Sequence, residues 1–386
     1  MISVKIVIRP ETAMEIQMKI TEISTFILHV PVTRGGVEDS THTLTHWGAP
    51  GVIIKTDAGI TGYGYTGTHA HLPSDRLVTQ CIDTCFGPEL IGKDPRETVG
   101  HYWNMELHPP TQWVGRGGIV QLAIGAIDVA LWDIKSKAEG LPLWKSLGGS
   151  EKTVTAYNTD GGWLNWSDEV LINDCRRIVE EEGYSGVKIK VGSPNIARDK
   201  RRISAVRKAV GDDITFMVDA NGKLDLPNAL LIGRHLDDHS VFWFEEPVWY
   251  DDVASHKRLA ESISTPIALG EQLYLADNFA TFMDAGALHF AQPDVARLGG
   301  ITPWLSVADM AKSRGLPVVS HVGDMMQVHL HLAVMHPACT MLEYIPWMRE
   351  CFTEPATTKD GNFIVPQEPG AGTTLASDAL DRFAVS

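Results

Sequence analysis

The sequence is poor in cysteine, has no long apolar run and carries fewer basic than acidic residues. Five cysteines are scattered over 386 residues. An odd and dispersed number is typical of reduced thiols in a cytoplasmic protein and not of a disulfide framework. No apolar stretch approaches the roughly 20 residues of a transmembrane helix. Arg9, Pro10 and Glu11 interrupt the apolar start, so the pattern of a secretory signal peptide is missing. These absences argue against an exported or membrane-spanning protein.

The excess of acidic residues limits the partners to be expected. Lys and Arg together number 33 and Asp and Glu 48, which gives a formal net charge of −15. Such a surface disfavours binding to nucleic acid or to an anionic membrane. A local site with lysines and a metal ion can still bind an anionic small molecule, because these positive charges determine the electric field within the site.

The chain is long enough for more than one domain, because single hydrophobic cores stop growing at about 250 to 300 residues. Residues 1–17 are expected to be an extension, since the stretch MKITEISTFILHV that follows has the pattern of a first strand. A hairpin around residues 56–59 and an amphipathic helix at 120–140 come next. This part of the chain therefore has an α+β pattern.

The second part is organised around residues 186–271, where short apolar runs each end on charged residues. The runs GVKIKVG, TFMVDANG, VFWFEEP and TPIALGEQ carry Lys188, Lys190, Asp219, Glu245 and Glu271. The three carboxylates follow one another at steps of 26 residues, the length of one strand, one helix and two loops. Helical stretches with apolar residues at intervals of three and four separate the strands. Repeated strand and helix units predict a parallel sheet that closes into a barrel.

Three further strands continue the row. LHFAQPD ends on Asp294, LPVVSH ends on His321, and TMLEYIP carries Glu343. The carboxyl ends of barrel strands carry the chemistry in folds of this kind. We therefore expect all of these polar side chains at one mouth of the barrel.

Three carboxylates on consecutive strands converge at this mouth. Without a cation, Asp219, Glu245 and Glu271 would be costly to bring together. Ligation by oxygen alone selects a hard ion, so we expect Mg²⁺. Glu246 competes with Glu245, because strand alternation admits only one of them, and the spacing does not decide between them. Asn221 lies two positions after Asp219 on the same side and is expected to support the metal site.

Two lysines share one side of the strand GVKIKVG, because alternate side chains point to opposite faces. Lys188 and Lys190 therefore project together into the mouth. Mutual repulsion and a nearby divalent cation are expected to lower a lysine pKa toward the range of a general base. A pair of solvated surface lysines is the alternative, which the apolar strand disfavours.

A carboxylate and a histidine end two neighbouring strands across the mouth. Asp294 can hold the imidazole of His321 in one tautomer and raise its pKa, which makes a general acid or base. A structural histidine is the alternative. The position at a strand end favours a catalytic role.

Two other patterns have structural interpretations. Gly62, Gly64 and Gly67 have the order of a dinucleotide-binding fingerprint, but they follow a tight turn and fit an antiparallel strand better than a strand that leads into a helix. His329 and His331 are two apart on an expected helix and point away from each other. We interpret these histidines as packing or surface residues, not as a zinc site.

The residues at the strand ends resemble those of the mandelate racemase subgroup of the enolase superfamily. The resemblance rests on a motif in fixed order, made of Lys188-x-Lys190, Asp219, Glu245, Glu271, Asp294, His321 and Glu343. It implies a modified TIM barrel, (β/α)7β, at residues 149–352. It also implies an α+β capping domain at 18–148 and a C-terminal segment at 353–386 that returns to the cap.

The resemblance implies abstraction of a proton alpha to a carboxylate, with Mg²⁺ stabilising the ene-diolate. Lys190 would take the proton on one face, and His321 would act on the other. Lys188 and a protonated Glu343 would bind the substrate carboxylate. Two bases on opposite faces permit racemisation, or dehydration if one conjugate acid protonates a departing β-hydroxyl. Members of the family commonly form homo-oligomers, which is the expectation here.

Within the subgroup, the stretches YNTDGGW, GVKIKVGSPN and QPDVARLGGIT are most similar to acid-sugar dehydratases of the talarate and galactarate type. We therefore expect dehydration of an aldarate or aldonate to a 2-keto-3-deoxy acid. One alternative is a racemase, epimerase or cycloisomerase of a 2-hydroxy acid that uses the same proton abstraction. Another is a nucleotide-dependent oxidoreductase built on the glycine-rich stretch.

Substrate identity is expected to depend on loops 31–48 and 65–72 of the capping domain. Polar residues of these loops that suit a hydroxylated chain are Arg34, His42, His46, His69 and His71. Arg34 is the expected partner if the substrate has a second carboxylate. Asn158, in the stretch YNTDGGW, is expected to support the site.

Overall fold

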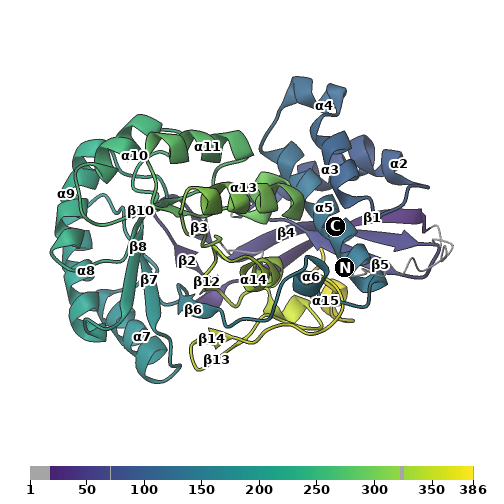
Figure 1. Ribbon diagram of the computed structural model, residues 1–386. Coiled ribbons are helices and arrows are strands. Elements are labelled where there is room, and N and C mark those ends of the chain that lie inside the picture. Colours follow the sequence, from purple (N-terminus) through teal and green to yellow (C-terminus); the bar gives the residue numbers. More distant parts are fainter. Residues whose placement is uncertain (1–17, 70, 322–325, 386) are drawn as a thin grey trace, which may run out of the picture.

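The computed structural model describes residues 18–69, 71–321 and 326–385 (Figure 1). The expected extension at residues 1–17 lies outside these ranges. The described chain has a barrel of strands ringed by helices and, beside it, a smaller part built on an antiparallel sheet. No helix within these ranges is long and apolar enough to cross a bilayer.

A three-stranded antiparallel sheet is the framework of the cap. Its spatial order is β1 (Ile20–Pro31), β4 (His46–Thr56) and β5 (Thr61–Tyr65). The main helices that follow are α1 (Asp75–Cys81), α2 (Gly87–Leu90), α3 (Thr98–Glu106), α4 (Pro109–Val114) and α5 (Ile119–Ala138). A second hairpin, β2 (Val37–Glu38) with β3 (Thr43–Leu44), connects β1 to β4.

The glycines of β5 have a packing role. Strand β5 pairs antiparallel with β4, as the sequence indicates. A Cβ atom on Gly64 would lie 1.9 Å from the carbonyl oxygen of Ala126, and one on Gly62 would lie 2.4 Å from that of Ala130. Both carbonyls belong to α5, so the missing side chains let this helix lie directly on the sheet. The glycine pattern in β5 therefore serves the packing of α5 on the sheet and not the binding of a nucleotide.

The barrel strands are parallel and close on themselves, which confirms the expected (β/α)7β class. They are β6 (Thr155–Asn158), β7 (Gly186–Lys190), β8 (Thr215–Asp219), β9 (Phe244–Glu245), β10 (Ile267–Leu269), β11 (Phe290–Ala291) and β12 (Met341–Tyr344). Val318 fills the place between β11 and β12 by bridging to Ala291 and Cys339. Strand β12 pairs with β6 and completes the ring.

Helices connect the strands and surround them (Figure 1). They are α7 (Asp168–Glu180), α8 (Ile196–Val210), α9 (Leu226–Asp237), α10 (Val253–Ala260), α11 (Ala276–Ala285), α13 (Ile301–Ser313) and α14 (Met326–Met335). Side chains of Ser167, Asn195, Asp225 and Asp252 accept backbone N–H groups at the starts of α7, α8, α9 and α10. These caps satisfy donors that have no partner within the helix.

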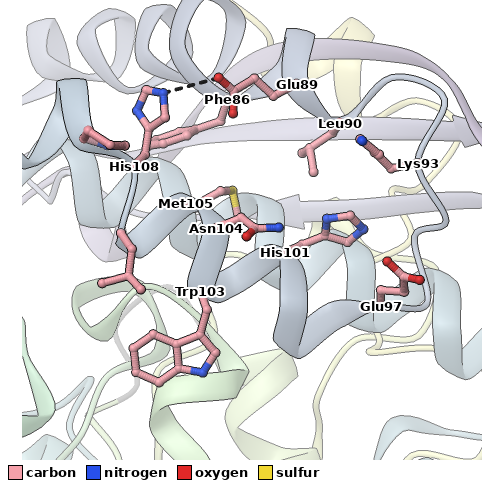
Figure 2. A pocket seen from close by; sticks show the side chains of 12 residues that line it. Phe86, Glu89, Leu90, Lys93, Glu97, His101, Trp103, Asn104, Met105 and His108 are labelled. Carbon is pink, nitrogen blue, oxygen red and sulfur yellow. Dashed lines mark ion pairs between the residues drawn. The ribbon is translucent and has the colours of Figure 1, made fainter.

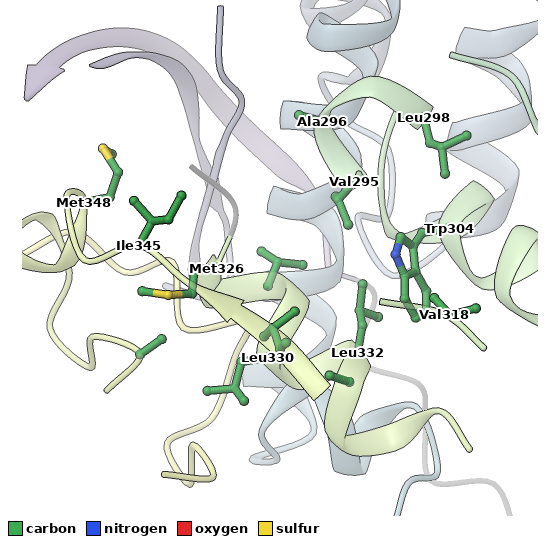
Figure 3. Packing of buried hydrophobic residues seen from close by; sticks show 14 of the residues in the cluster. Val295, Ala296, Leu298, Trp304, Val318, Met326, Leu330, Leu332, Ile345 and Met348 are labelled. Carbon is green, nitrogen blue, oxygen red and sulfur yellow. The ribbon is translucent and has the colours of Figure 1, made fainter. Parts of the chain in front are cut away.

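Apolar packing closes the barrel where strand pairing is sparse. Figure 3 shows Trp304 of α13 beside Val318, with Leu332 of α14 nearby. All three side chains are fully buried, and the Trp304 indole donates to Ser320 Oγ at 3.0 Å. Helix α14 is buried from Met326 to Val334, and its polar residues Gln327, His329 and His331 are buried with the apolar ones.

The C-terminal segment contacts both parts of the molecule. Strands β13 (Thr358–Lys359) and β14 (Asn362–Phe363) form a hairpin that pairs with β6. Further on, Thr373 Oγ1 donates to the carbonyl of Tyr63 in β5, and Ala384 bridges to Leu28 in β1. These contacts tie the chain end to the cap sheet.

Candidate active site

Three carboxylates from neighbouring strands meet at the carboxyl end of the barrel. Asp219 ends β8, Glu245 ends β9 and Glu271 follows β10. One oxygen of each lies within 4.8 Å of the others, and all three side chains are buried. Parallel strands in register explain this, because Asp219 lies beside Glu245 in the sheet. The strand spacing in the sequence predicts the same convergence.

The donor set fits a hard cation. Burial raises the pKa of Glu245 to about 7, even though Lys188 opposes this shift. Oε2 of Glu271 is buried and accepts no hydrogen bond from the described residues. Three buried carboxylates of this kind are stabilised most by a bound cation that prefers oxygen ligands.

Glu246 and Asn221 lie beside this cluster. Glu246 is buried in a left-handed backbone conformation (φ 35°), and Glu245 is the member of the pair that joins the cluster. The backbone N–H of Asn221 donates to Asp219 Oδ1 at 2.8 Å, and its side-chain amide lies 3.4 Å from Glu271 Oε1. Asn221 therefore links two of the three carboxylates.

The two lysines of β7 are both buried and both paired. Lys188 Nζ lies 2.7 Å from Glu245 Oε1, and Lys190 Nζ lies 2.5 Å from Asp219 Oδ2. Burial alone would lower the pKa of each amine. The neighbouring carboxylates outweigh burial and hold both pKa values above the ordinary range. The expected lowering rested on a nearby divalent cation as well as on repulsion between the amines; with the carboxylates as partners of the lysines, the shift is upward.

Glu343 differs from expectation in its charge. Its Oε1 lies 2.9 Å from Lys188 Nζ and accepts the hydroxyl of Thr159. Burial would raise the pKa of Glu343, but the charges of Lys188, His321 and Lys190 lower it to about 2. The side chain is thus ionised in this arrangement, whereas the family resemblance implies a protonated one.

His321 and Asp294 form the expected pair. Nδ1 of His321 lies 2.6 Å from Asp294 Oδ2, and Nε2 lies 3.4 Å from Glu271 Oε2. Burial would lower the pKa of His321, but the charges of Glu271 and Asp294 raise it to about 9. Asp294 Oδ1 also accepts the backbone N–H of Ala296 at the start of α12 (Val295–Leu298), which fixes the carboxylate. At neutral pH this imidazole is a proton donor.

A small pocket of about 30 Å³ opens above these groups. The barrel contributes Lys190, Asn221, Glu271, His321 and Glu343, together with Trp163, Ile345 and Trp347. The cap contributes Asp39, His42, Leu44, Trp47 and His69. Loops 31–48 and 65–72 therefore do reach the site. Asp39 and the three tryptophans were not foreseen, because nothing in their spacing separates them from surface or core residues.

Three residues expected near the substrate lie elsewhere in the structure. Arg34 forms a two-contact ion pair with Asp174 of α7, each contact 2.7 Å, and its guanidinium lies 4.5 Å from the centre of the Trp166 ring. His46 is exposed at the start of β4. Asn158 is buried on β6, where its Oδ1 accepts the N–H of Asp160. None of the three lines the pocket, and neither does the exposed His71 of the cap loop 65–72.

A larger cavity of about 710 Å³ lies in the cap (Figure 2). Figure 2 shows the ion pair of Glu89 with His108 at one end and His101 further along. His101 Nε2 lies 2.7 Å from the carbonyl oxygen of Asp94. These groups are spread along the walls and do not converge, so volume alone is a poor guide to the reactive site here.

Two families match this chain. The N-terminal domain of mandelate racemase and muconate lactonizing enzyme matches residues 22–148, and the enolase C-terminal domain-like family matches residues 170–379.

Several characterised proteins are similar to this chain. An L-talarate/galactarate dehydratase from Salmonella typhimurium is 40% identical over 291 residues, which are 75% of this chain and 72% of that protein. An arabinonate dehydratase from Saccharolobus solfataricus is 32% identical over 86% of this chain and 89% of its own. The crystal structure of the Salmonella enzyme with Mg and L-lyxarohydroxamate superposes with a TM-score of 0.90, covering 100% of this chain and 97% of that one at 32% identity.

Proposed function

Because the chain belongs to the mandelate racemase and muconate lactonizing enzyme family of the enolase superfamily, we propose that it is a magnesium-dependent acid-sugar dehydratase. Its substrate would be a polyhydroxy acid and its product a 2-keto-3-deoxy acid. Relatives named as dehydratases of talarate, galactarate and arabinonate support this reaction class. The observation that carries the proposal is the meeting of three carboxylates, two lysines and an Asp–His pair at one barrel mouth.

Asp219, Glu245 and Glu271 would hold the Mg²⁺ ion. When bound, the ion supplies positive charge beside the substrate carboxylate, where negative charge develops as the C2 proton leaves. Asn221 would keep Asp219 and Glu271 in place. These assignments use oxygen ligands from three strands that the barrel fixes in register.

Lys190 and His321 would divide the proton transfers. Lys190 would take the proton from C2 as the neutral amine, a state reached when Asp219 gives its charge to a cation instead of to the lysine. His321, which is protonated at neutral pH, would donate to the hydroxyl leaving C3. The C3–O bond breaks as the C2–C3 double bond forms, and water leaves. The resulting enol becomes the 2-keto acid.

Lys188 would bind a carboxylate oxygen of the substrate. It lies between Glu245 and Glu343, and both keep it charged. A cation at this position also offsets the second negative charge of an ene-diolate. Asp294 would act by fixing the His321 ring.

A screen of acid sugars tests this proposal. Purified protein with Mg²⁺ is incubated with matched mono- and diacids, and 2-keto product is detected with a carbonyl reagent. Formation of the keto acid with Mg²⁺, and its loss with EDTA, is the expected result. Exchange of the C2 proton in D₂O without keto product would favour the second candidate, a racemase or epimerase. Two proton-transfer groups on non-neighbouring strands would permit that reaction as well.

The chain is further proposed to act as a homo-oligomer in the cytoplasm, with residues 18–148 as cap, 149–352 as barrel and 353–386 as the returning segment. All five cysteines are free, which suits a reducing compartment. Light scattering after size exclusion would give the oligomeric state directly. A measured mass equal to that of a monomer would contradict the proposed homo-oligomer.

A further inference from the structure

We propose that the substrate end remote from the reacting carboxylate is an uncharged hydroxyl terminus, so that the enzyme prefers an aldonate to the aldarate of the same configuration. The inference rests on the proposed function. It follows from the charges and contacts on the cap side of the pocket.

The turn between β2 and β3 forms this wall and is fastened to the barrel. Ser40 Oγ donates to the carbonyl of Ala220, directly after β8, at 2.7 Å. The Leu164 N–H donates to the Glu38 carbonyl at 2.8 Å. A Cβ on Gly192 would lie only 3.0 Å from Ser40 Cβ, so the turn sits close on the β7 end. Asp39 and His42 therefore have fixed positions over the mouth.

The two titratable residues of the turn are hydrogen-bonded to each other. Asp39 Oδ1 accepts the backbone N–H groups of Thr41 and His42, each at 2.6 Å, and Oδ2 lies 3.1 Å from His42 Nδ1. The hydrogen bond to Asp39 raises the pKa of His42 above its usual value. Asp39 and His42 thus form a hydrogen-bonded pair at the pocket, in which the Asp39 carboxylate is ionised.

His69, beside this pair, is neutral. Its ring stacks on His321 with centroids 5.7 Å apart and 12° between the planes. Nη2 of Arg297 lies 2.6 Å from its Nδ1, and since a guanidinium only donates, the ring must accept. Arg297 does not line this pocket; it lines a neighbouring one that shares His42 and His69 with it.

The described residues that line this pocket offer no free cation to a second carboxylate. Among the described residues that line the pocket, His42 is paired with Asp39, and Lys190 and His321 are the groups proposed to act at C2 and C3, at the reacting end of the substrate. The other lining residues carry no positive charge: they are the neutral His69, Asn221, the acidic Glu271 and Glu343, and the apolar Leu44, Trp47, Trp163, Ile345 and Trp347. Arg34 is held by Asp174 outside the pocket.

A buried carboxylate needs a charged partner or several donors, and a like charge nearby adds repulsion. Asp39 would supply that repulsion. A hydroxyl, in contrast, both donates and accepts, so it can bond to the Asp39 carboxylate and to an imidazole N–H of His42. The chemistry of the wall therefore selects a sugar-alcohol end over an acid end.

Matched pairs such as galactonate and galactarate test the inference, because they differ only at C6. With Mg²⁺, kcat/KM for the preferred aldonate should exceed that for its aldarate by about tenfold or more, the scale expected for an unpaired buried charge. An equal or higher value for the aldarate would overturn the inference. If neither acid is dehydrated, the proposed function fails, but calorimetric affinities of the same pair still decide: tighter aldonate binding supports the charge argument and tighter aldarate binding refutes it.

Asp39→Asn isolates the charge. The amide keeps an oxygen for the turn, so the variant retains the shape while it removes the repulsion. The aldonate-to-aldarate ratio of kcat/KM, or of affinity, should fall several-fold. Asp57→Asn makes the same change in the exposed β4–β5 turn, where Asp57 accepts the Lys19 N–H, and should leave the ratio unchanged. An Asp39→Asn ratio equal to that of wild type would contradict the role of Asp39.

Discussion

His321 and Asp294, 27 residues apart, lie on adjacent strand positions with Nδ1 and Oδ2 only 2.6 Å apart, and both side chains are buried. This contact sets the imidazole as a proton donor toward the pocket, with its pKa raised to about 9 after Glu271 and Asp294 outweigh burial. The following predictions test this pair and the structure around it.

Asp294→Asn should lower kcat about 100-fold or more, the range expected for loss of a general acid. The amide carries no negative charge that could stabilise the imidazolium of His321. The pH above which activity declines should therefore be lower in the variant. The pH profile of kcat is the measurement. Asp309→Asn is a matched control, since Asp309 contacts His336 at 3.2 Å on the outer helices. A profile that is identical in the Asp294 variant and wild type would remove His321 from the acid role.

Removal of Mg²⁺ with EDTA should abolish product formation, and added Mg²⁺ should restore it. Glu271→Gln should weaken Mg²⁺ binding about tenfold or more, because it removes one of three charged ligands. Calorimetric titration with Mg²⁺ measures this. Glu261→Gln, at the exposed end of α10, is the control. Unchanged affinity in the Glu271 variant would place the ion elsewhere.

Acid should destabilise the fold through buried neutral histidines. Burial lowers the pKa of His331 from 6.5 to about 3, so the unfolded chain binds a proton between these values and the folded chain does not. The contribution to stability is present above pH 6.5 and is lost as the pH falls toward 3. His331→Asn should therefore flatten the fall of the unfolding free energy below pH 6.5. Exposed His71→Asn should not, and an equal effect of both would contradict the assignment.

Gly64→Ala should destabilise the cap. The added Cβ would meet the Ala126 carbonyl at 1.9 Å, so α5 must move away from β5. Overpacking of this kind costs about 1 to 3 kcal/mol. Thermal unfolding measures the change. Gly100→Ala, in α3 with open space around it, should be neutral or stabilising. A Gly64 variant as stable as wild type would mean that the helix does not lie directly on the sheet.

The barrel and its strand-end residues could be predicted from sequence because their placement depends on local and periodic patterns in the chain. Alternation places Lys188 and Lys190 on one side of β7, and a repeat of about 26 residues brings Asp219, Glu245 and Glu271 to one edge. No long-range information is needed for either inference.

The pairing partners could not be predicted in the same way. Arg34 forms an ion pair with Asp174, 140 residues away, and Ser40 donates a hydrogen bond to Ala220, 180 residues away. The direction of the lysine pKa shifts depends on such partners too, because Lys190 gains more from Asp219 than it loses to Lys188. A polar loop shows which side chains are available but not which of them are already paired.

The central claim is that Lys190 removes the proton at C2 and His321 drives loss of the hydroxyl at C3. Proton NMR in D₂O with Mg²⁺ and the best acid sugar tests it in three proteins: wild type, Lys190→Ala and His321→Asn. Wild type should form keto acid, His321→Asn should exchange the C2 proton for deuterium without forming keto acid, and Lys190→Ala should do neither. Undiminished exchange in Lys190→Ala, or keto acid from His321→Asn at the wild-type rate, would contradict the account.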